Sequence, residues 1–552
     1  MLKTKLSTLI KKIAKENFGE EIEVSLQKPP KKDFGNFSTN AAMQLASHLR
    51  RNPQEIGKAI IKGLRRELDK DEFLVQRIRG VEFAPPGFIN FFLKESSLFP
   101  VLAEIDKKGL LYGSSDLGRG KKINIEFVSA NPTGPLNIAH GRQAALGDTL
   151  ANILGDQGYS VSREYYINDE GNQIKLLGES TRARYLEILG EKVSIPREGY
   201  RGDYIKEIAR IIFEQYKEKV REKDVDFFAQ FAMRQILEQI KKDLQDFGVE
   251  FDVWFSQRSI SSEKIKEVIR ELEKRGYILR EEGATFFKST IFGDDKDRVL
   301  IKSNGEWTYF APDIAYHQNK YQRGFSKVIN LWGPDHHGYV LRLKAAVEAL
   351  GYPLETISIL IVQLVTLYRG REKMMMSTRA GEFISLRQLL KEIGRDAARF
   401  FFVSRRSDSH LDFDLELAKK KSLDNPVYYI QYAHARICSI IEFAKGTLEN
   451  SAHFQDIADL GPLLNKKKEI ELIKKLEEFP EVLETIAQRL EPHRLTTYLY
   501  QLSSTFHSFY NEYRVVTEDK KLSSARLLLV RCTKIVLQKG LELLGITAPK
   551  RM

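Results

Sequence analysis

Alternating apolar and polar residues from Ile123 to Val128 predict a strand, after which the chain breaks at Asn131-Pro132 and Gly134-Pro135. Apolar residues then recur at helical spacing from Ile138 to Leu154. A strand, a Gly/Pro turn and a helix N-terminus in this order form a place where backbone N–H groups and the helix dipole hold phosphate. An ordinary βα unit whose polar residues only cap the helix is the alternative interpretation of the same pattern.

The first 95 residues predict a separate unit. Helical and extended patterns alternate there, and this order is typical of a small α+β domain. The predicted elements are a helix over Met1–Phe18, a strand over Glu21–Gln27, helices over about 38–50 and 53–68, and extended segments over Val75–Phe83 and Phe88–Leu93.

The middle of the chain predicts a parallel sheet that is interrupted by helices. Tyr165–Gly171 predicts a second strand with a polar turn, and long charged helical patterns fill about 172–280. The parallel-sheet pattern returns at Thr285–Lys288, Val299–Lys302 and Val328–Trp332, and Ile357–Tyr368 is typical of one buried parallel strand. A helical insertion that splits a doubly wound α/β domain explains this order.

The fold class that follows is α/β. We predict a Rossmann-type doubly wound parallel sheet with a helical insertion, an N-terminal α+β domain and a C-terminal all-α bundle, because 426–552 consists of amphipathic helical patterns. The expected boundaries are residues 1–95 for the N-terminal domain, 110–400 for the sheet domain, with the insertion at about 172–280, and 401–552 for the helical domain.

Composition agrees with several soluble domains. The chain has 552 residues, which is too long for one core, and its 42% hydrophobic and 29% charged residues are globular values. A net charge of +12, with 22 Tyr and 32 Phe, is compatible with a polyanionic partner such as RNA. Charged faces are usually only solvated, so the charge alone does not decide this.

Metal and membrane sites are not expected. Cys438 lies four residues after His434 on a predicted helix, and Asp335 precedes two histidines, but neither group has a third ligand in a recognisable spacing. The lysine-rich N-terminus has no apolar signal core, and the longest apolar run is too short to span a bilayer. We expect a cytoplasmic protein without a membrane partner.

Three polar, glycine-punctuated stretches are expected to meet at the carboxyl ends of the sheet. One loop, Lys373–Arg379, offers two cations and two hydroxyls. Such a loop could close over a triphosphate, and a solvated basic loop without a ligand is the alternative interpretation. Glu126 and Asp313, with Tyr309 nearby, suit a guanidinium substrate, although Glu126 also fits an exposed strand position. The three stretches are Ser129–Arg142, Tyr309–Asp313 with Asp335–Gly338, and Lys373–Gly381.

Together these stretches carry a resemblance to a known family. Ala130–Arg142 is similar to the HIGH region of class I aminoacyl-tRNA synthetases, and Met376–Gly381 occupies the position of their KMSKS loop. From end to end the chain resembles the bacterial-type arginyl-tRNA synthetases. Further segments with this similarity are Phe34–Asn40, Tyr166–Gln173, Phe251–Phe255, Asp335–Tyr339, Gln431–Arg436 and Ala548–Met552.

The resemblance implies a two-step reaction. Arginine and ATP would give arginyl-adenylate, and the arginyl group would then move to the 3′ end of tRNA(Arg), which is expected to be bound before arginine is activated. Mg²⁺ would arrive with ATP, and no tightly bound protein metal is expected. The family further implies an N-terminal domain at the tRNA elbow and a C-terminal domain at the anticodon, and we expect a monomer.

The resemblance also assigns residues. Asn137, by its place three residues before His140, either shares a helix face with it or caps the helix. Catalytic roles fall on Asn137, His140, Lys373, Ser377 and Arg379, and ATP binding falls on Asn131, Pro132, Thr133, Gly134, Asn137, His140, Gly141, Met376, Ser377 and Thr378. Arginine binding falls on Glu126, Ser129, Asn131, His140, Tyr309 and Asp313, and tRNA binding on Phe88, Asn90, Tyr429 and Arg436, the last two of which equally suit helix packing.

Three positions depart from the family's motifs. Asn137 stands for the first HIGH histidine, Ala139 for the usual glycine, and Thr378 for the second lysine of the loop. Asparagine keeps a neutral N–H donor but never becomes an imidazolium, so its phosphate contact is weaker. Two other functions therefore compete with an active ligase: a tRNA-binding protein that has lost catalysis, and a small-molecule adenylating ligase on the same fold.

Overall fold

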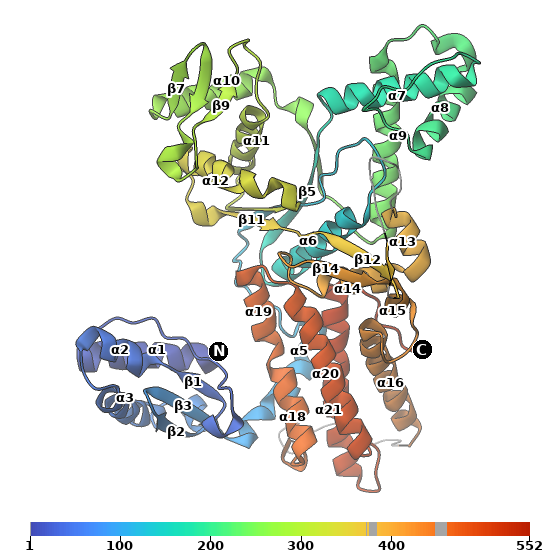
Figure 1. Ribbon diagram of the computed structural model, residues 1–552. Helices are drawn as coiled ribbons and strands as arrows, with labels where there is room; N and C mark the ends of the chain where they lie inside the picture. The colour runs from blue at the N-terminus through green and yellow to red at the C-terminus, as the bar shows by residue number, and fades with distance from the viewer. Residues whose placement is uncertain (1, 371, 375–383, 448–460) are drawn as a thin grey trace. The chain divides into compact units, whose positions relative to one another are not determined.

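The computed structural model describes residues 2–370, 372–374, 384–447 and 461–552 (Figure 1). It divides into two compact units. The first consists of Met1–Gly109, Ile440–Glu478 and Thr505–Ile535, and the second of Leu110–Ser439, Phe479–Ser504 and Val536–Met552.

The N-terminal part of the first unit is a three-stranded antiparallel sheet packed on helices, in the order β1-β3-β2. Its core is built from residues at helical spacing, such as Leu6, Ile10 and Ile13, all at most 1% exposed. The predicted strand over Glu21–Gln27 is wrong, because only its last residue pairs there, through a bridge between Gln27 and Ser38 in the described residues. The elements are α1 (Leu2–Phe18), β1 (Phe37–Thr39), α2 (Ala41–Leu49), α3 (Pro53–Leu68), α4 (Glu72–Val75), β2 (Ile78–Ala84) and β3 (Phe88–Leu93).

The C-terminal part of the chain is helical from Pro426 onward in its described residues. Long amphipathic helices form it, and one buried ion pair, from Arg526 Nε to Glu469 Oε1 at 2.8 Å, joins two of them. These helices are α16 (Pro426–Thr447), α18 (Lys467–Glu477), α19 (Phe479–Arg489), α20 (His493–Glu512) and α21 (Lys520–Leu543), with α5 (Pro100–Lys108) preceding the second unit.

The second unit is built on a five-stranded parallel sheet in the order β11-β10-β4-β5-β6. If these five strands are numbered 1 to 5 in chain order, their order in the sheet from β6 to β11 is 3-2-1-4-5. This is the doubly wound arrangement that we predicted. The strand order reverses between β4 and β10, and ligands bind at that edge in such folds. The strands are β4 (Lys122–Glu126), β5 (Ser160–Ile167), β6 (Val253–Ser256), β10 (Lys327–Trp332) and β11 (Ile357–Ile361).

Helices connect these strands, and β6 lies within the segment predicted as a helical insertion. Because β6 pairs in parallel with β5, the helices before it are part of a long crossover, in which α7, α8 and α9 pack on one another (Figure 1). The helices are α6 (Ile138–Asp156), α7 (Asn172–Ile188), α8 (Asp203–Tyr216), α9 (Val225–Asp246), α10 (Ser262–Lys274), α11 (Phe310–Gln322) and α12 (Val340–Ala349).

Two predicted parallel strands belong elsewhere. The strands near Thr285 and Val299 form a separate antiparallel sheet, β7-β8-β9, because each strand runs back beside the one before it, through a tight turn after β7 and a longer connection after β8. The sheet consists of β7 (Ile278–Glu281), β8 (Ala284–Phe287) and β9 (Arg298–Ile301).

The apolar run over Ile357–Tyr368 is two strands instead of one. After β11 the Gln363 N–H donates to the Ser407 carbonyl at 2.8 Å, which takes the chain out of the five-stranded sheet. The strand that follows pairs with β14, so the region predicted as a helical domain, 401–552, also contains a strand. The elements are β12 (Val365–Arg369), β13 (Glu372–Lys373), α13 (Leu386–Ile393), α14 (Arg395–Val403), β14 (Leu411–Asp414) and α15 (Leu415–Lys419).

Candidate active site

The turn after β4 is held by its own backbone and side chains. Val128 and Ser129 have φ angles of 68° and 39°, in the left-handed region that non-glycine residues rarely adopt. Such strain collects at functional sites, where the surrounding structure supports it. The Ser129 hydroxyl donates to Glu126 Oε1 at 3.1 Å and accepts from the Tyr166 N–H at 3.1 Å. The turn therefore links the carboxyl ends of β4 and β5.

A capping box formed by Asn137 and His140 begins α6. Asn137 Oδ1 accepts from the His140 N–H at 3.1 Å, and His140 Nδ1 accepts from the Asn137 N–H at 3.2 Å. Because Nδ1 accepts, the neutral ring carries its proton on Nε2. Burial lowers the pKa of His140 to about 4, against the opposing charge of Asp335, so the ring is neutral at pH 7. Of the two roles considered for Asn137, the structure shows the N-cap.

The residues between this turn and α6 are held by α7 and α8. Asn131 Nδ2 donates to Gln173 Oε1 at 2.7 Å, and the Thr133 carbonyl accepts from the Tyr204 hydroxyl at 2.8 Å. A Cβ added at Gly134 would lie 3.2 Å from that same hydroxyl. The long crossover therefore forms one wall of the turn that we predicted to hold ATP.

Pro132 and Gly141 are tightly packed. Pro132 is buried in the turn. A Cβ added at Gly141 would lie 2.8 Å from Leu386 Cδ1 and 3.0 Å from Phe402 Cε2, so the missing side chain lets α6 approach α13 and α14. This packing role of Gly141 accompanies the ATP contact predicted for it.

Glu126 is a buried, ion-paired carboxylate. It is 6% exposed, so the alternative of an exposed strand residue is wrong. Its Oε2 accepts from Lys320 Nζ at 2.6 Å, and the same ammonium donates to Asn330 Oδ1 at 3.1 Å. Asn330 lies opposite Glu126 in the register between β4 and β10, so this pair lies at the point where the strand order reverses.

A second buried carboxylate, Glu164, lies on β5. In the parallel pairing of β4 with β5, Glu164 is the partner of Glu126. It accepts from both Arg323 guanidinium nitrogens, at 2.6 and 2.9 Å, and from the Tyr316 hydroxyl at 2.6 Å. Burial opposes ionisation of Glu164, but these donors and the nearby Lys320 charge together keep its pKa below the ordinary value. Glu164 is therefore an anion whose hydrogen bonds are internal.

Asp313 differs from both of these carboxylates. It lies in the first turn of α11, and its Oδ2 accepts from the Tyr339 hydroxyl at 2.6 Å. Burial raises its pKa to about 7, and the Glu126 charge adds to this effect, whereas Tyr339 and Lys320 oppose it. No ion pair to Asp313 exists among the described residues. Tyr309, which precedes α11, is 68% exposed and available to a ligand.

The predicted KMSKS loop lies largely outside the described residues. Met376, Ser377, Thr378 and Arg379 all belong to that part of the chain, whereas Lys373 is an exposed residue of β13. Where the description resumes, Ser385 forms a bridge with Asn137, and the Leu386 N–H donates to the Leu136 carbonyl at 2.8 Å. The chain thus returns from this segment directly beside the start of α6.

The residues predicted to contact tRNA lie on two elements. Phe88 and Asn90 belong to β3; Phe88 is 38% exposed, and Asn90 is 4% exposed with an Oδ1 that has no hydrogen-bond partner among the described residues. Tyr429 and Arg436 belong to α16 and are half-buried. Tyr429 packs on Tyr500 with ring centroids 5.2 Å apart. The Arg436 guanidinium lies 5.3 Å from the Tyr432 ring centroid.

Metal ligands do not cluster in the part of the chain that the structure describes, where no group of three or more His, Cys, Asp or Glu side chains suits an ion. His336 and His337 are exposed after β10. Within those same residues, no helix is long and apolar enough to cross a membrane.

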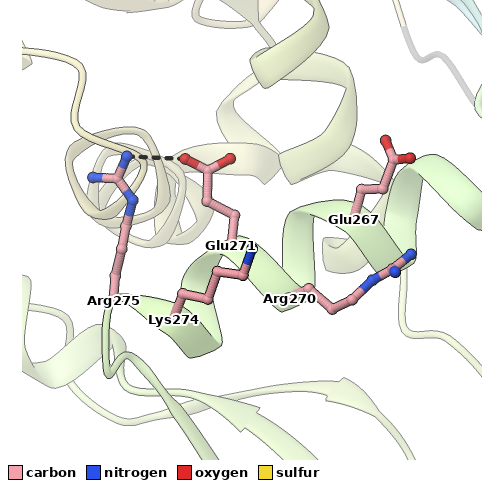
Figure 2. A pocket seen from close by; sticks show the side chains of 5 residues that line it. All are labelled: Glu267, Arg270, Glu271, Lys274 and Arg275. Carbon is pink, nitrogen blue, oxygen red and sulfur yellow. Dashed lines mark hydrogen bonds and ion pairs between the residues drawn. The ribbon is translucent and has the colours of Figure 1, made fainter.

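A groove of about 530 Å³ runs along α10 and is lined only by charged side chains. Figure 2 shows these acidic and basic side chains on α10 and on the residue directly after it, with Arg275 donating to Glu271 at 2.9 Å. None of them is a predicted site residue, and their opposite charges largely cancel. The lining residues are Glu267, Arg270, Glu271, Lys274 and Arg275.

Four residues near the predicted pocket were missed by the sequence analysis. Their shared signal is spacing: Tyr316, Lys320 and Arg323 follow Asp313 at intervals of three or four, which places them on one face of a helix. Glu164 lies near the carboxyl end of β5, and Glu126 lies at that of β4. Charged residues on a helix face are usually solvated, so this spacing by itself did not single them out.

Three family models match the chain. The arginyl tRNA synthetase N terminal domain matches residues 1–93, the catalytic domain of the class I tRNA synthetases (R) matches residues 102–408, and the DALR anticodon binding domain matches residues 430–552.

Relatives cover nearly the whole chain. The arginine–tRNA ligase of Citrifermentans bemidjiense is 49% identical over 540 residues, which are 97% of this chain and 96% of the relative. That of Geobacillus thermodenitrificans is 46% identical over 536 residues, covering 96% and 94%. The arginyl-tRNA synthetase structure from Thermus thermophilus, at 22% identity and full coverage of both chains, has a TM-score of 0.78 and confirms the predicted fold class. This chain belongs to the class I arginyl-tRNA synthetases.

Proposed function

We propose that this arginine–tRNA ligase activates L-arginine with ATP where β4 and β10 end, and then transfers the arginyl group to the 3′ end of tRNA(Arg). One observation carries the proposal. At the same reversal of strand order, α6 presents donors for an anion, while α11 presents Asp313, a carboxylate without a cation among the described residues. A triphosphate and a guanidinium need these two kinds of partner.

ATP is assigned to the start of α6 and the loop that ends beside it. The proposed donors to the phosphate oxygens are His140 Nε2–H and the N-terminus of α6, which the capping box leaves with these donors. Mg²⁺ accompanies ATP as part of the substrate. The proposed ATP ligands are Asn131, Pro132, Thr133, Gly134, Asn137, His140, Gly141, Met376, Ser377 and Thr378, with Lys373, Ser377 and Arg379 on the pyrophosphate side.

In the activation step, a carboxylate oxygen of arginine attacks the α-phosphorus of ATP. The bond from that phosphorus to the bridging oxygen breaks, and pyrophosphate leaves. His140, which is neutral at pH 7, stabilises the charge that develops by donating its Nε2–H. In the second step a hydroxyl at the tRNA 3′ end attacks the arginyl carbonyl carbon, and AMP leaves.

Arginine is assigned to the space between the β4 turn and α11. Asp313 supplies the negative charge, and the exposed Tyr309 is the residue directly before α11. A planar guanidinium matches a carboxylate through two parallel hydrogen bonds, which an ammonium cannot form. The proposed pocket residues are Glu126, Ser129, Asn131, His140, Tyr309 and Asp313.

The flanking regions are proposed to hold the tRNA. Residues 1–95, with Phe88 and Asn90, are assigned to the elbow, and residues 401–552, with Tyr429 and Arg436, to the anticodon, leaving 110–400 for catalysis. The net charge of +12 supports a polyanionic partner. We further propose that the enzyme works as a monomer in the cytoplasm.

ATP–pyrophosphate exchange tests this proposal. With saturating tRNA, exchange should require arginine, and lysine should not replace it. Charging of purified total tRNA with each common amino acid should label tRNA(Arg) alone. Exchange without any amino acid, or salt-sensitive tRNA binding without charging, would overturn the assignment of a ligase active site.

A further inference from the structure

The second half of α6 carries a row of polar side chains within a mostly buried helix. Asp148, Asn152 and Asp156 are four residues apart, which places them on one side of the helix. The same helix begins with the turn that contains His140, the proposed donor to ATP. Because backbone hydrogen bonds run along the whole helix, a displacement of the row also displaces the His140 ring.

Two residues of this row bond directly to the end of α21. Asn152 Nδ2 donates to the Leu543 carbonyl at 3.2 Å. Asp156 forms an ion pair with Lys539, and the two side chains are 9% and 11% exposed. Lys539 lies one turn before Leu543, and Asp156 lies one turn after Asn152, so the two helices bond at matching intervals. A shift of either helix by one turn would break both bonds.

Arg399 of α14 makes the third connection between α6 and the end of α21. The residue is 0% exposed, and its guanidinium donates to Asp148 Oδ2 at 2.5 Å and to the Leu544 carbonyl at 2.6 Å. A Cβ added at Gly545 would lie 2.5 Å from Arg399 Cζ, so the backbone passes directly against the guanidinium. A buried cation holds the end of α21 to α6.

The residues that follow α21 are held as well. The Thr547 N–H donates to Asp396 Oδ2 at 3.3 Å, and the Thr547 carbonyl accepts from Gln431 Nε2 at 3.0 Å. His434 Nδ1–H donates to the Pro549 carbonyl at 2.8 Å. Asp396 belongs to α14, whereas Gln431 and His434 belong to α16. The end of the chain therefore joins α16 to α14 and α6.

These connections suit the fixing of a position better than the supply of stability. A buried ion pair loses hydration, so apolar side chains of similar size often stabilise a protein as well or better. Polar partners at matching intervals instead select one register between two helices. The compact unit that contains the parallel sheet also contains Val536–Met552, so the end of the chain packs as part of that unit.

We propose that residues 539–549 are a positioning element of the active site, which holds α6 through Asp148, Asn152 and Asp156 in the register that places His140 against ATP. This inference rests on the proposed function and adds to it residues that lie outside the proposed substrate pockets. A misplacement of about 1 Å can cost roughly 10²-fold in rate, even when its cause is far from the chemistry. Loss of one of the three connections should therefore lower kcat.

Pyrophosphate exchange tests this role, with ATP, arginine and tRNA saturating. Asn152→Asp keeps the oxygen that accepts from Arg163 but turns a second oxygen toward the Leu543 carbonyl. Lys539→Met removes the ion pair with Asp156. Each variant should lower kcat roughly tenfold, with the KM for arginine unchanged. Lys539→Arg keeps the cation and should retain at least about half of the wild-type kcat.

A His140→Ala background separates positioning from a loss of folded protein. If the end of the chain acts through His140, Lys539→Met should lower the residual kcat less than about twofold once the ring is absent. Partial unfolding would lower kcat by the same factor in both backgrounds. Equal losses in the two backgrounds, or a wild-type kcat in both Asn152→Asp and Lys539→Met, would overturn the inference.

Lys534→Met is the matched control, because Lys534 is a half-buried lysine of the same helix. Its kcat should equal that of the wild type. Thermal unfolding identifies any variant that does not fold. Asn152→Asp leaves no buried cation without its partner, so it decides the question if Lys539→Met does not fold. A wild-type protein without arginine-dependent exchange would instead overturn the proposed function.

Discussion

The N-terminal turns of α6 and α11 border the same sheet edge but are built in opposite ways. At α6 the side chains complete one another's hydrogen bonds: Asn137 caps the helix, and His140 accepts through Nδ1 and stays neutral. At α11 no side chain caps the helix, and Asp313 keeps a carboxylate that burial makes harder to ionise. The first turn of α6 offers hydrogen-bond donors, whereas the first turn of α11 holds a carboxylate without an ion pair among the described residues.

Under the proposed function, this difference would let one edge bind substrates of opposite charge. Donors at a helix N-terminus need no counter-ion, so they can be complete before an anion arrives. A carboxylate that binds a substrate cation must have no cation partner before the substrate binds. Desolvation then raises the pKa of this carboxylate until the substrate cation arrives. Internal ion pairs with Lys320 and Arg323 neutralise the two neighbouring carboxylates, Glu126 and Glu164.

Removing the Asp313 carboxylate, the acceptor at α11, should have the largest effect on activity. Asp313→Asn keeps the shape but removes the charge, so a guanidinium would be desolvated without a carboxylate. We expect kcat/KM for arginine to fall roughly 10³–10⁴-fold in pyrophosphate exchange. Asp412→Asn, at an exposed position of β14, is the control. A loss below tenfold in Asp313→Asn would mean that another group receives the substrate cation.

Breaking the donor side should have the next largest effect. His140→Ala removes the Nε2–H and should lower kcat by roughly 10²–10³-fold, if this donor stabilises charge in the transition state. His336→Ala, an exposed histidine near the same edge, should change kcat little. An unchanged kcat in His140→Ala would remove this side chain from the mechanism.

The pH dependence of kcat/KM should distinguish the carboxylate at α11 from the histidine at α6. Asp313 is protonated below its pKa of about 7 and ionised above it, so arginine binding should strengthen as pH rises. Between pH 6 and pH 8 we expect kcat/KM for arginine to rise about tenfold, which follows from the ionised fraction of a group with this pKa. His140, with a pKa near 4, should add no inflection in this range. A profile that is flat or falls with pH would contradict the state assigned to Asp313.

Removing the cap of α6 should have the smallest effect. Asn137→Ala loses the bond from the His140 N–H and should lower the free energy of unfolding of this region by about 1 kcal/mol, visible as a lower Tm. Asn137→Asp keeps an acceptor and serves as the control. Asn137→His restores the family's imidazole and is expected to preserve or raise the exchange rate. A collapse of that rate would show that the asparagine cap is coupled to catalysis.

Much of this arrangement could be predicted from local pattern. The β4–turn–α6 unit was predicted within two residues, because alternation, Asn-Pro and Gly-Pro breaks and helical spacing are all local signals. The order of strands near Thr285 and Val299 could not be predicted in this way. Alternation indicates a strand with a buried face, but it does not name the neighbouring strand or its direction.

The sequence by itself determined the β4–turn–α6 unit, the family and the residue types at the candidate site. Only the tertiary structure decided that Glu126 is paired and Asp313 is not. Lys320 lies 194 positions from Glu126 along the chain, and it looked like any other lysine of a charged helix. Spacing records which face of a helix a residue occupies, whereas the partner of a buried charge depends on which segments fold against that face.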